Sequence, residues 1–579
     1  MTITEALKII QSAQPDSPPF DVMVACGFTP LHLQTLLTAQ LQRQLPKRRV
    51  KLTSGLFGDL AGTLENLTDS KLDAALIVIE WPDLDPRLGF RSLAAWGAHA
   101  VADILDSART MLDRIAVAIR RVPPPIQVGV VLPTLPFPPL FHTAAWQAGE
   151  TELLLHLDLA QFASQIAQNG RVRIASTSYL AEQSPSSTRL DLKSYLLTGF
   201  PYTLKHADQV AAASTRLLLP SPPKKGIITD LDDTLWAGIA GEVGPDRVGW
   251  DLAGHNQLHG LYQNLLAALS EQGTLVAVAS KNDLGVVRKV FERPDLLLRP
   301  ERIFPIEVHW QAKSGSVSRI LETWNIGSDA VIFVDDSPME LAEVAAVHPE
   351  IETVLFPNRD YDAALATLRL LRDLCAKERV SQDDTIRLDS VRKGAEFRQQ
   401  VSSASTPEHF LAQLHAVLSF DFAAADSRVL ELVNKTNQFN LNGLRYTNSD
   451  WHKQCSRPAA ICVAVAYEDK FGPLGTIGVI QGVTRGQTLH LDTWAMSCRA
   501  FSRRIEHQCL RVLFQRTGVD TIDFQFKSTA KNGPMRDFLT TIMGKTPDCP
   551  CCLSREIFDK YCPLLYHQTP EIGRTAANG

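Results

Sequence analysis

The segment 226-GIITDLDDTLWAGIAGEVG-244 decides the fold of the middle of the chain. Its apolar start predicts a short buried strand, and the carboxylate of Asp230 follows directly at the strand end. In doubly wound parallel sheets the ligand groups gather at the carboxyl ends of the strands. We therefore expect Asp230 to lie in a crevice at that edge of an α/β sheet.

Three further elements follow in the order that phosphate chemistry requires. Ser280 ends the apolar run 274-TLVAVA, Lys313 lies in a turn within 310-WQAK, and Asp335 with Asp336 follows 330-AVIFV. The Ser280 hydroxyl would hold a phosphoryl oxygen with help from Asn282, and Lys313 would supply positive charge. Taken together, these elements predict one phosphate site, whereas the plainer alternative is that the aspartates only cap helices.

The aspartates have distinct expected roles. Asp230 is the candidate nucleophile at phosphorus, and Asp232 is the candidate proton donor and later base. Adjacent carboxylates repel, so we expect Mg²⁺, which prefers oxygen ligands and substrate phosphates. The candidate metal ligands are Asp230, Asp232, Asp335 and Asp336, and Thr234 is a candidate substrate contact beside Asn282.

The hydrophobic pattern divides the chain into three folded sections and a tail. The first two sections alternate apolar strands with helices, which predicts doubly wound parallel sheets. The third follows the charged segment 376-AKERVSQDDTIRLDSVRK and predicts an α+β section, with helices at 407–418 and 426–435 and antiparallel strands. The strands expected in the first section are 21-DVMVACGF, 74-AALIVIE, 126-IQVGVVL and 171-RVRIAST. The expected boundaries are 1–220, 221–380, 381–565 and a flexible tail at 566–579.

Composition excludes several classes of function. The 579 residues carry 58 basic and 63 acidic side chains, a net charge of −5, which argues against bulk binding to nucleic acid or anionic lipid. No apolar run reaches the roughly 18 residues of a membrane span, and the start MTITEALKII has no apolar core of a secretory signal. Ten cysteines are too dilute for a disulfide scaffold. We expect a cytoplasmic protein without nucleic-acid or membrane partners.

The phosphate motifs resemble those of the haloacid dehalogenase (HAD) superfamily. Asp232 and Ser280 stand 48 positions apart, which leaves room for one helix and a small flap but not for a large lid domain. Within the superfamily the chain resembles the FkbH-like branch, subfamily IIIC, in these segments: 230-DLDDTLWAGIAGEVG, 280-SKND, 310-WQAK, 335-DDSPME, 434-NKTNQFNLNGLRYT and 496-MSCRAFSRRIE. The sequence departs from the family pattern where Asp233 and Ser337 replace the usual Asn, and where Ala237 and Ser502 replace Gly.

This resemblance implies activity in polyketide-type biosynthesis. Members of the branch capture a three-carbon glyceryl unit from 1,3-bisphosphoglycerate, lose its phosphate and pass the acyl group to the phosphopantetheine thiol of an acyl carrier protein. For this chain the resemblance implies Mg²⁺ as cofactor, a phosphorylated small molecule as substrate and an acyl carrier protein as partner.

The flanking sections resemble other folds. The first is similar to an SGNH-hydrolase-like domain, but Thr29 and no Ser follows its first strand, and His206 is what remains of the base, so we expect binding or docking there. The third resembles an N-acetyltransferase-like fold, in which the loop 499–504 would cradle phosphates. Candidate contacts for the carrier's pantetheine arm are Asn434, Lys435, Arg445, Cys498 and Arg499. The alternative for 434–446 is a hydrogen-bonded loop that locks a domain interface.

The thiol chemistry stays open at the level of sequence. Glyceryl-loading members place a Cys between the two motif aspartates, and this chain has Leu231 there. The carrier thiol attacks the acyl phosphate directly, or Cys498 holds the acyl group, or the chain performs phosphorus chemistry alone. Two broader alternatives to the carrier-dependent enzyme are a stand-alone small-molecule phosphatase and a non-catalytic biosynthetic scaffold.

Overall fold

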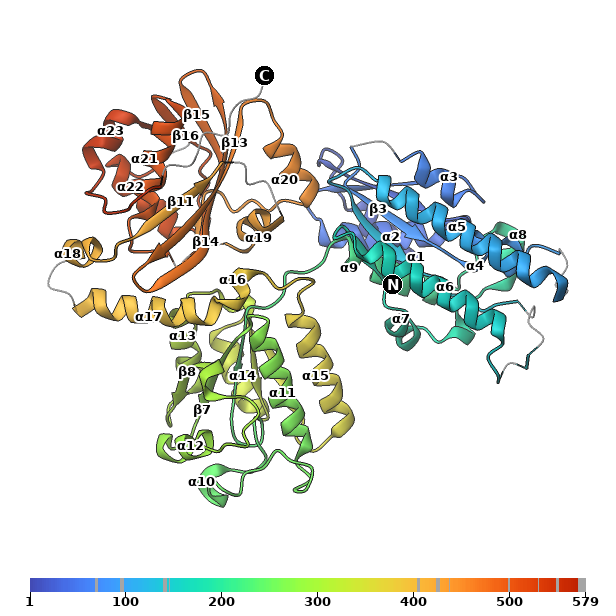
Figure 1. Cartoon of the computed structure of the whole chain (residues 1–579), viewed down its shortest axis with the longest axis horizontal. Coiled ribbons are helices and arrows are strands. Elements are labelled where there is room, and N and C mark those ends of the chain that lie inside the picture. The colour runs from blue at the N-terminus through green and yellow to red at the C-terminus, as the bar shows by residue number, and fades with distance from the viewer. Residues whose placement is uncertain are drawn as a thin grey trace. The chain divides into compact units, whose positions relative to one another are not determined.

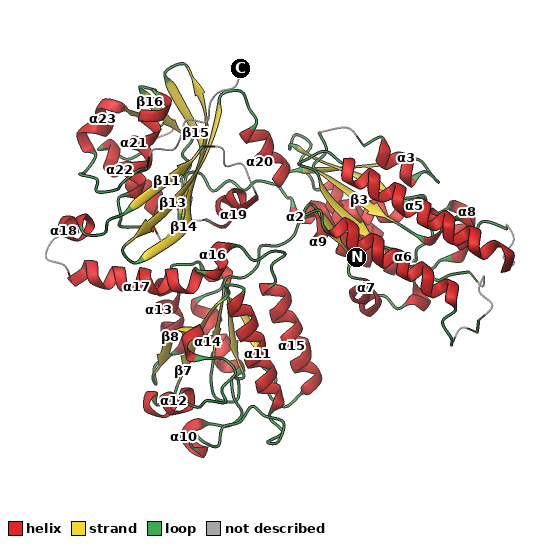
Figure 2. Cartoon of the chain, in the orientation of Figure 1, coloured by secondary structure: helices red, strands yellow, loops and turns green. Residues whose placement is uncertain are grey.

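The computed structural model describes residues 1–570 except 68–70, 94–97, 139–142, 145, 404–406, 423–426, 437, 498–499, 530 and 548–550. The chain forms two compact units. The first comprises Met1–Ser221 together with Tyr446–Lys453, and the second comprises the rest of the described chain from Pro222 onward. Figures 1 and 2 show the helices and strands of each unit.

The first unit contains a five-stranded sheet in the order β2-β1-β3-β4-β5, and every neighbouring pair is parallel. Helices α1, α2 and α9 pack on one face, and α3, α5 and α6 pack on the other. The strands are β1 (Pro19–Ala25), β2 (Arg49–Ser54), β3 (Ala74–Val78), β4 (Gln127–Val131) and β5 (Val172–Ile174). The helices are α1 (Ile3–Gln11), α2 (Leu31–Gln44), α3 (Leu60–Glu65), α4 (Trp81–Leu84), α5 (Val101–Arg121), α6 (Glu150–Ala167), α7 (Thr177–Gln183), α8 (Leu192–Thr198) and α9 (Leu204–Leu218).

The second unit begins with another five-stranded parallel sheet, in the order β10-β9-β6-β7-β8. Its central strands are buried on both faces between two apolar clusters, as their near-continuous apolar sequences require. The strands are β6 (Gly226–Thr229), β7 (Leu275–Ser280), β8 (Ile303–Val308), β9 (Val331–Asp335) and β10 (Glu352–Leu355). The helices are α10 (Ala240–Val243), α11 (Gln257–Glu271), α12 (Leu284–Phe291), α13 (Lys313–Trp324), α14 (Pro338–Val347) and α15 (Tyr361–Cys375).

A mixed seven-stranded sheet follows in the same unit, in the order β11-β13-β14-β15-β16-β17, with β12 paired to β15. All its pairs are antiparallel except β15 with β16. The strands are β11 (Val417–Asp421), β12 (Phe439–Asn440), β13 (Ala460–Asp469), β14 (Gly472–Arg485), β15 (Thr488–Met496), β16 (Thr521–Phe524) and β17 (Cys551–Ser554). The helices are α16 (Gln382–Thr385), α17 (Arg387–Ser403), α18 (Pro407–Ala412), α19 (Ser427–Lys435), α20 (Asn448–Cys455), α21 (Ile505–Thr517), α22 (Gly533–Met543) and α23 (Arg555–Tyr561).

The expected α/β class is confirmed for the two parallel sheets, and the third sheet is mixed. The sequence patterns missed β11, β12 and β17 in the mixed sheet and β2, β8 and β10 in the parallel sheets. Each of the last three is an edge strand with exposed or half-exposed positions, so none presents a continuous apolar run. The expected helix 407–418 is wrong beyond Ala412, because His415 takes a left-handed conformation with φ 51° and the chain then enters β11.

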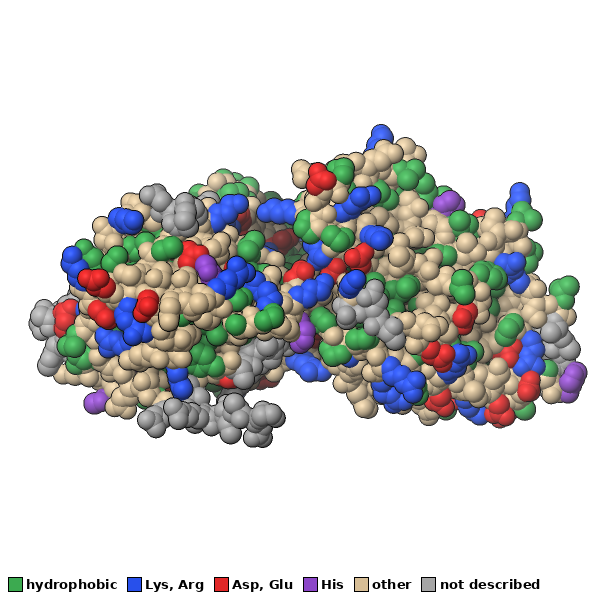
Figure 3. Space-filling view, turned by 90° about the horizontal axis from the view of Figure 1, so that it is seen from above, with side chains coloured by type: hydrophobic (Ala, Val, Ile, Leu, Met, Phe, Trp, Pro, Cys, Tyr) green, Lys and Arg blue, Asp and Glu red, His purple; other side chains and the backbone are tan. Residues whose placement is uncertain are grey.

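Within the described residues, every helix is too short or too polar to cross a bilayer. On the face seen in Figure 3, acidic and basic side chains are intermixed.

Candidate functional site

Asp230 stands at the carboxyl end of β6, the middle strand of its sheet. All four residues of β6 are buried, and the Asp230 backbone N–H donates to the carbonyl of Val334 on β9 at 2.9 Å. The Asp230 side chain is 6% exposed. Because β9 is the direct neighbour of β6, the two residues that close β9 reach the same crevice.

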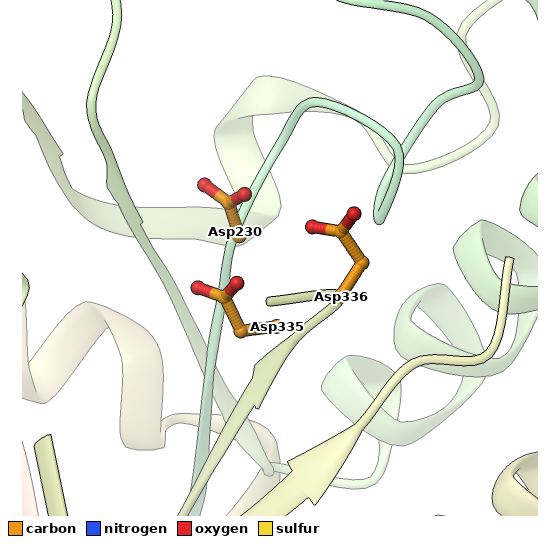
Figure 4. Close-up of side chains that lie close together, drawn as sticks. All are labelled: Asp230, Asp335 and Asp336. Atoms are coloured by element: carbon orange, nitrogen blue, oxygen red, sulfur yellow. The ribbon is translucent and has the colours of Figure 1, made fainter. Parts of the chain in front are cut away.

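Three carboxylates meet in that crevice. Asp230, Asp335 and Asp336 each offer an oxygen, and these oxygens lie within 4.8 Å of one another. Figure 4 shows Asp335 and Asp336 at the end of β9 and Asp230 on the neighbouring segment, with the carboxylates on one side. We call this group the aspartate cluster. It brings together three of the four residues expected to hold a metal.

Lys313 is the cation of the aspartate cluster. Its Nζ lies 2.6 Å from Asp335 Oδ2 and 3.1 Å from Asp230 Oδ1. Burial alone would lower the pKa of Lys313, but the charges of Asp230 and Asp335 outweigh it and raise that pKa. Burial raises the pKa of Asp335 and of Asp336, and the charge of Asp230 raises both further. One ammonium thus faces three carboxylates, and negative charge is left over.

The cluster fits a hard divalent cation. Within the described part of the chain, Asp230 Oδ1 is buried and receives no hydrogen bond, although Lys313 is its ion-pair partner. Carboxylate oxygens with surplus negative charge are the ligands that Mg²⁺ prefers. Asp230, Asp335 and Asp336 are therefore the residues that would hold the ion.

Asp232 is held outside the aspartate cluster. Its Oδ1 accepts hydrogen bonds from Trp236 Nε1 at 2.8 Å and from the Ala240 backbone N–H at 3.1 Å. Its Oδ2 accepts one from Asn282 Nδ2 at 2.8 Å. Burial raises the pKa of Asp232, which favours the protonated form that a general acid needs. Among the described residues, the carboxylates that lie close enough together to hold a metal ion do not include that of Asp232.

Asn282 and Thr234 have different surroundings from those expected. Asn282 was predicted to touch substrate, but its amide nitrogen is used to orient Asp232. Thr234 Oγ1 lies 3.4 Å from Asp336 Oδ1, so it contacts the aspartate cluster. Ser280 closes β7 beside β6 and is 4% exposed, in the position predicted for a phosphate contact.

Trp236 and Asn358 were not predicted by the motif pattern. Asn358 follows β10, and its Nδ2 donates to Asp336 Oδ2 at 3.3 Å. Its place just beyond a strand end is a signal that a complete assignment of the strands would have revealed. The contact of Trp236 with Asp232 depends on a tight turn in which Asp233 takes φ 51° and accepts a hydrogen bond from Gly238.

A short excursion of the chain leads from the turn after Asp232 to α11. The chain after the turn pairs Ala237 with Gly249 in an antiparallel bridge and then enters α11 at Gln257. This short excursion matches the expected absence of a large lid in the interval before Ser280.

Lys435, one of the described pantetheine candidates, lies away from the aspartate cluster. Lys435 lines a cavity of about 150 Å³ together with Lys225 and Leu275, which precede β6 and begin β7. A strand of four residues spans about 13 Å. Because Asp230 follows the other end of β6, the cavity lies at the amino ends of the strands and the aspartate cluster lies at their carboxyl ends.

Other residues of the expected arm site have structural partners. Arg445 donates to the carbonyls of Val433 at 3.3 Å and Thr436 at 3.0 Å, which closes the end of α19. Lys435 pairs with Glu431 one turn earlier, and Asn434 stands beside it in α19. These contacts favour the hydrogen-bonded loop among the alternatives for this segment.

The loop expected to cradle phosphates is only partly described. Cys498 and Arg499 lie outside the described residues. Arg503 is 3% exposed, lies over the Phe397 ring at 3.7 Å and pairs with Asp469. Arg504 pairs with Glu408 at 2.6 Å. The guanidinium groups of Arg503 and Arg504 are thus engaged with this chain's own residues.

His206 of the first unit is buried and structural. Its ring nitrogens hydrogen bond Thr134 Oγ1 at 2.9 Å and Ser184 Oγ at 3.0 Å. Burial lowers the pKa of His206 to about 3. A base needs access to a nucleophile and a proton affinity near the working pH. The geometry of His206 therefore does not favour a role as catalytic base.

Comparison with solved structures identifies a shared fold. The chain resembles the crystal structure of the N-terminal part of the protein BF1531 from Bacteroides fragilis, which contains a phosphatase domain and is complexed with Mg. The two are 20% identical, the match covers 64% of this chain and 98% of that one, and the TM-score is 0.50. At this identity the likeness shows the fold alone.

A second solved structure matches more weakly. Phospholipase A1 from Streptomyces albidoflavus is 13% identical over 34% of this chain and 98% of that one, and its TM-score of 0.25 carries no argument. No protein-family model matches the chain, and no curated protein matches it.

Proposed function

We propose that the chain is a Mg²⁺-dependent phosphatase in which Asp230 is the nucleophile. The observation that carries the proposal is the aspartate cluster with its buried Lys313, placed at the carboxyl ends of adjacent parallel strands. The neighbour from Bacteroides fragilis, whose structure contains a phosphatase domain with Mg, supports the same reading.

The first half-reaction is transfer of the phosphoryl group to the enzyme. An Asp230 carboxylate oxygen attacks phosphorus, the bond from phosphorus to the leaving oxygen breaks, and an aspartyl-phosphate forms. Asp232 gives its proton to the leaving oxygen. Its three hydrogen bonds fix that carboxyl group beside Asp230.

The second half-reaction is hydrolysis. Asp232, now deprotonated, takes a proton from water, and the water oxygen attacks phosphorus to release phosphate and restore Asp230. Lys313 and the hydroxyl of Ser280 hold the phosphoryl oxygens throughout. A bound Mg²⁺ would neutralise part of the phosphoryl charge.

We further propose that the substrate is an acyl phosphate resembling 1,3-bisphosphoglycerate and that an acyl carrier protein accepts the acyl unit. In this transfer the carrier thiol attacks the carbonyl carbon, the bond from that carbon to the phosphate oxygen breaks, and phosphate leaves, so Asp230 forms no aspartyl-phosphate from the acyl phosphate group. The support is the resemblance of the motifs between about 225 and 510 to the FkbH-like branch of the HAD superfamily. In this version the first and third sections serve the carrier, as SGNH-like and acyltransferase-like domains. The observed engagement of Arg445, Arg503 and Arg504 with the chain itself does not add to that support.

A stand-alone phosphatase is the second candidate, and one observation favours it. Leu231, in the position where glyceryl-loading members place Cys, is 0% exposed and packs in the apolar core. No thiol is therefore available between the two motif aspartates. Phosphorus chemistry at Asp230 needs none.

Phosphate release from acetyl phosphate and from 1,3-bisphosphoglycerate, measured with and without a carrier protein, separates these functions. Carrier-dependent release with acyl loading of the carrier supports the transferase. Carrier-independent release supports the stand-alone phosphatase. No release from either substrate, with Mg²⁺ present, contradicts both and leaves the non-catalytic scaffold.

A further inference from the structure

Four exposed apolar residues follow the four strands β6, β7, β8 and β9. Trp310 is 75% exposed, Met339 is 77% exposed, and Leu284 and Ile239 are each 41% exposed. We call these four residues the apolar rim. Single exposed hydrophobic residues are common on protein surfaces, so the rim needs an argument from position.

Each rim residue lies only a few positions along the chain from a residue of the candidate site. Trp310 stands three residues before Lys313, and Met339 stands three residues after Asp336. Since consecutive Cα atoms are 3.8 Å apart, three residues span at most about 11 Å. These two side chains therefore start close to the aspartate cluster.

Leu284 and Ile239 lie close in sequence to residues that hydrogen bond Asp232. Leu284 stands two residues after Asn282, which donates to Asp232. Ile239 directly precedes Ala240, whose N–H donates to the same carboxylate. The four residues lie on four different connections, all of which leave the carboxyl edge of the sheet. Because these strands are parallel, the rim residues and the aspartate cluster lie at the same edge of the sheet.

The phosphate and the organic group of the substrate would bind in regions of different charge. The buried Lys313 would bind the phosphate at the aspartate cluster, together with the cation that the cluster would hold. At the rim the cation Lys281 is neutralised by Glu340, whose Oε1 lies 2.6 Å from its Nζ. A second anionic group on the substrate would therefore gain little binding free energy there. An apolar group would be removed from water by packing against Trp310 and Met339.

We propose that the apolar rim binds the organic group of the substrate and selects phosphate compounds in which an apolar chain or ring follows the phosphate. Trp310 and Met339 are the specificity-determining residues. This inference rests on the proposed function for the position of the phosphate. It agrees with the phosphatase proposed above but replaces the 1,3-bisphosphoglycerate-like substrate, because that compound is short, polar and doubly anionic.

Binding of alkylphosphonates tests the rim without turnover. Calorimetric titration of the full chain with methyl-, butyl- and hexylphosphonate in MgCl₂ gives the affinity as a function of chain length. Full burial of a methylene contributes about 0.8 kcal/mol, so a half-open rim should tighten binding about twofold per methylene and about thirtyfold from methyl to hexyl. Trp310→Ala and Met339→Ala should each reduce that ratio to about fivefold or less.

Val347→Ala is the matched control. Val347 is 56% exposed and ends α14, whose first turn carries Met339, and eight residues of helix separate the two by about 12 Å. This variant should keep the wild-type ratio. Equal affinity for methyl- and hexylphosphonate, no binding of either, or an unchanged ratio in both rim variants would overturn the inference. Phosphate release from acetyl phosphate by the wild type tests the proposed function separately, since chain-length selectivity in binding does not require it.

Discussion

Lys313 Nζ lies 2.6 Å from Asp335 Oδ2, and the two side chains are only 5% and 0% exposed. The same ammonium lies 3.1 Å from Asp230 Oδ1, so it is shared between the ends of β6 and β9. This contact limits the repulsion among the carboxylates when no metal is present. In the proposed reaction the ammonium also holds the phosphoryl oxygens.

Lys313→Met should destabilise the metal-free protein. Removing one partner of a buried ion pair leaves an uncompensated charge, which costs about 3–5 kcal/mol. Urea unfolding in EDTA measures this loss, and Mg²⁺ should recover part of it. Lys281→Met is the control, because its pair with Glu340 is more exposed and is worth at most about 1 kcal/mol. Equal losses for the two variants would contradict the role given to Lys313.

Asp336→Asn should stabilise the metal-free protein at alkaline pH. Burial raises the pKa of Asp336 in the folded state. A raised pKa means that the contribution to stability is present below the unfolded value of about 3.9 and is lost as the pH rises through the folded value. The variant avoids that loss, so its urea midpoint in EDTA should exceed the wild-type midpoint at pH 8 and approach it near pH 4. Mg²⁺ should stabilise the wild type more than the variant. A lower midpoint for the variant at pH 8 would show that the carboxylate is not strained there.

Asp232→Asn should affect substrates according to their leaving groups. General acid catalysis contributes about 10²–10⁴-fold when the leaving oxygen needs a proton. We expect kcat to fall by that factor for an alkyl phosphate and by much less for p-nitrophenyl phosphate, whose leaving group departs as an anion. Asp283→Asn, at an exposed helix cap, serves as the control. Equal losses on both substrates would argue against Asp232 as the acid.

Intact-protein mass spectrometry after incubation with an acyl phosphate should detect no stable acyl adduct. Leu231 is buried and has no nucleophile, and nothing described places a thiol beside Asp230. The result that contradicts this prediction is an acyl adduct on the wild type that disappears in Cys498→Ala. It would assign the third section a covalent role.

The residues of the aspartate cluster could be predicted because parallel topology converts order in sequence into proximity. Asp230 and Asp335 each follow a buried apolar run, and such runs are the central strands of the sheet. Lys313 could be predicted only with the motif pattern, since its place at the start of α13 depends on how the edge strand β8 ends.

The remaining contacts depend on three-dimensional structure that no local pattern encodes. The bond from Asn282 to Asp232 joins two loops, so the sequence could place Asn282 near the site without giving its partner. β8 contains Pro305 and half-exposed positions, which hide it from a search for apolar runs. Arg445 was expected to bind a ligand, yet arginine near a helix end also satisfies free carbonyls, as it does for α19.

The rate of phosphate release by Asp230→Asn, measured with acetyl phosphate and Mg²⁺, tests the central claim most directly. Asn keeps the shape of the side chain and replaces the anionic carboxylate by a neutral amide, which is a poor nucleophile. Loss of a covalent nucleophile should lower kcat by about three orders of magnitude or more. Phosphate release within about tenfold of the wild-type rate would contradict an aspartyl-phosphate on Asp230.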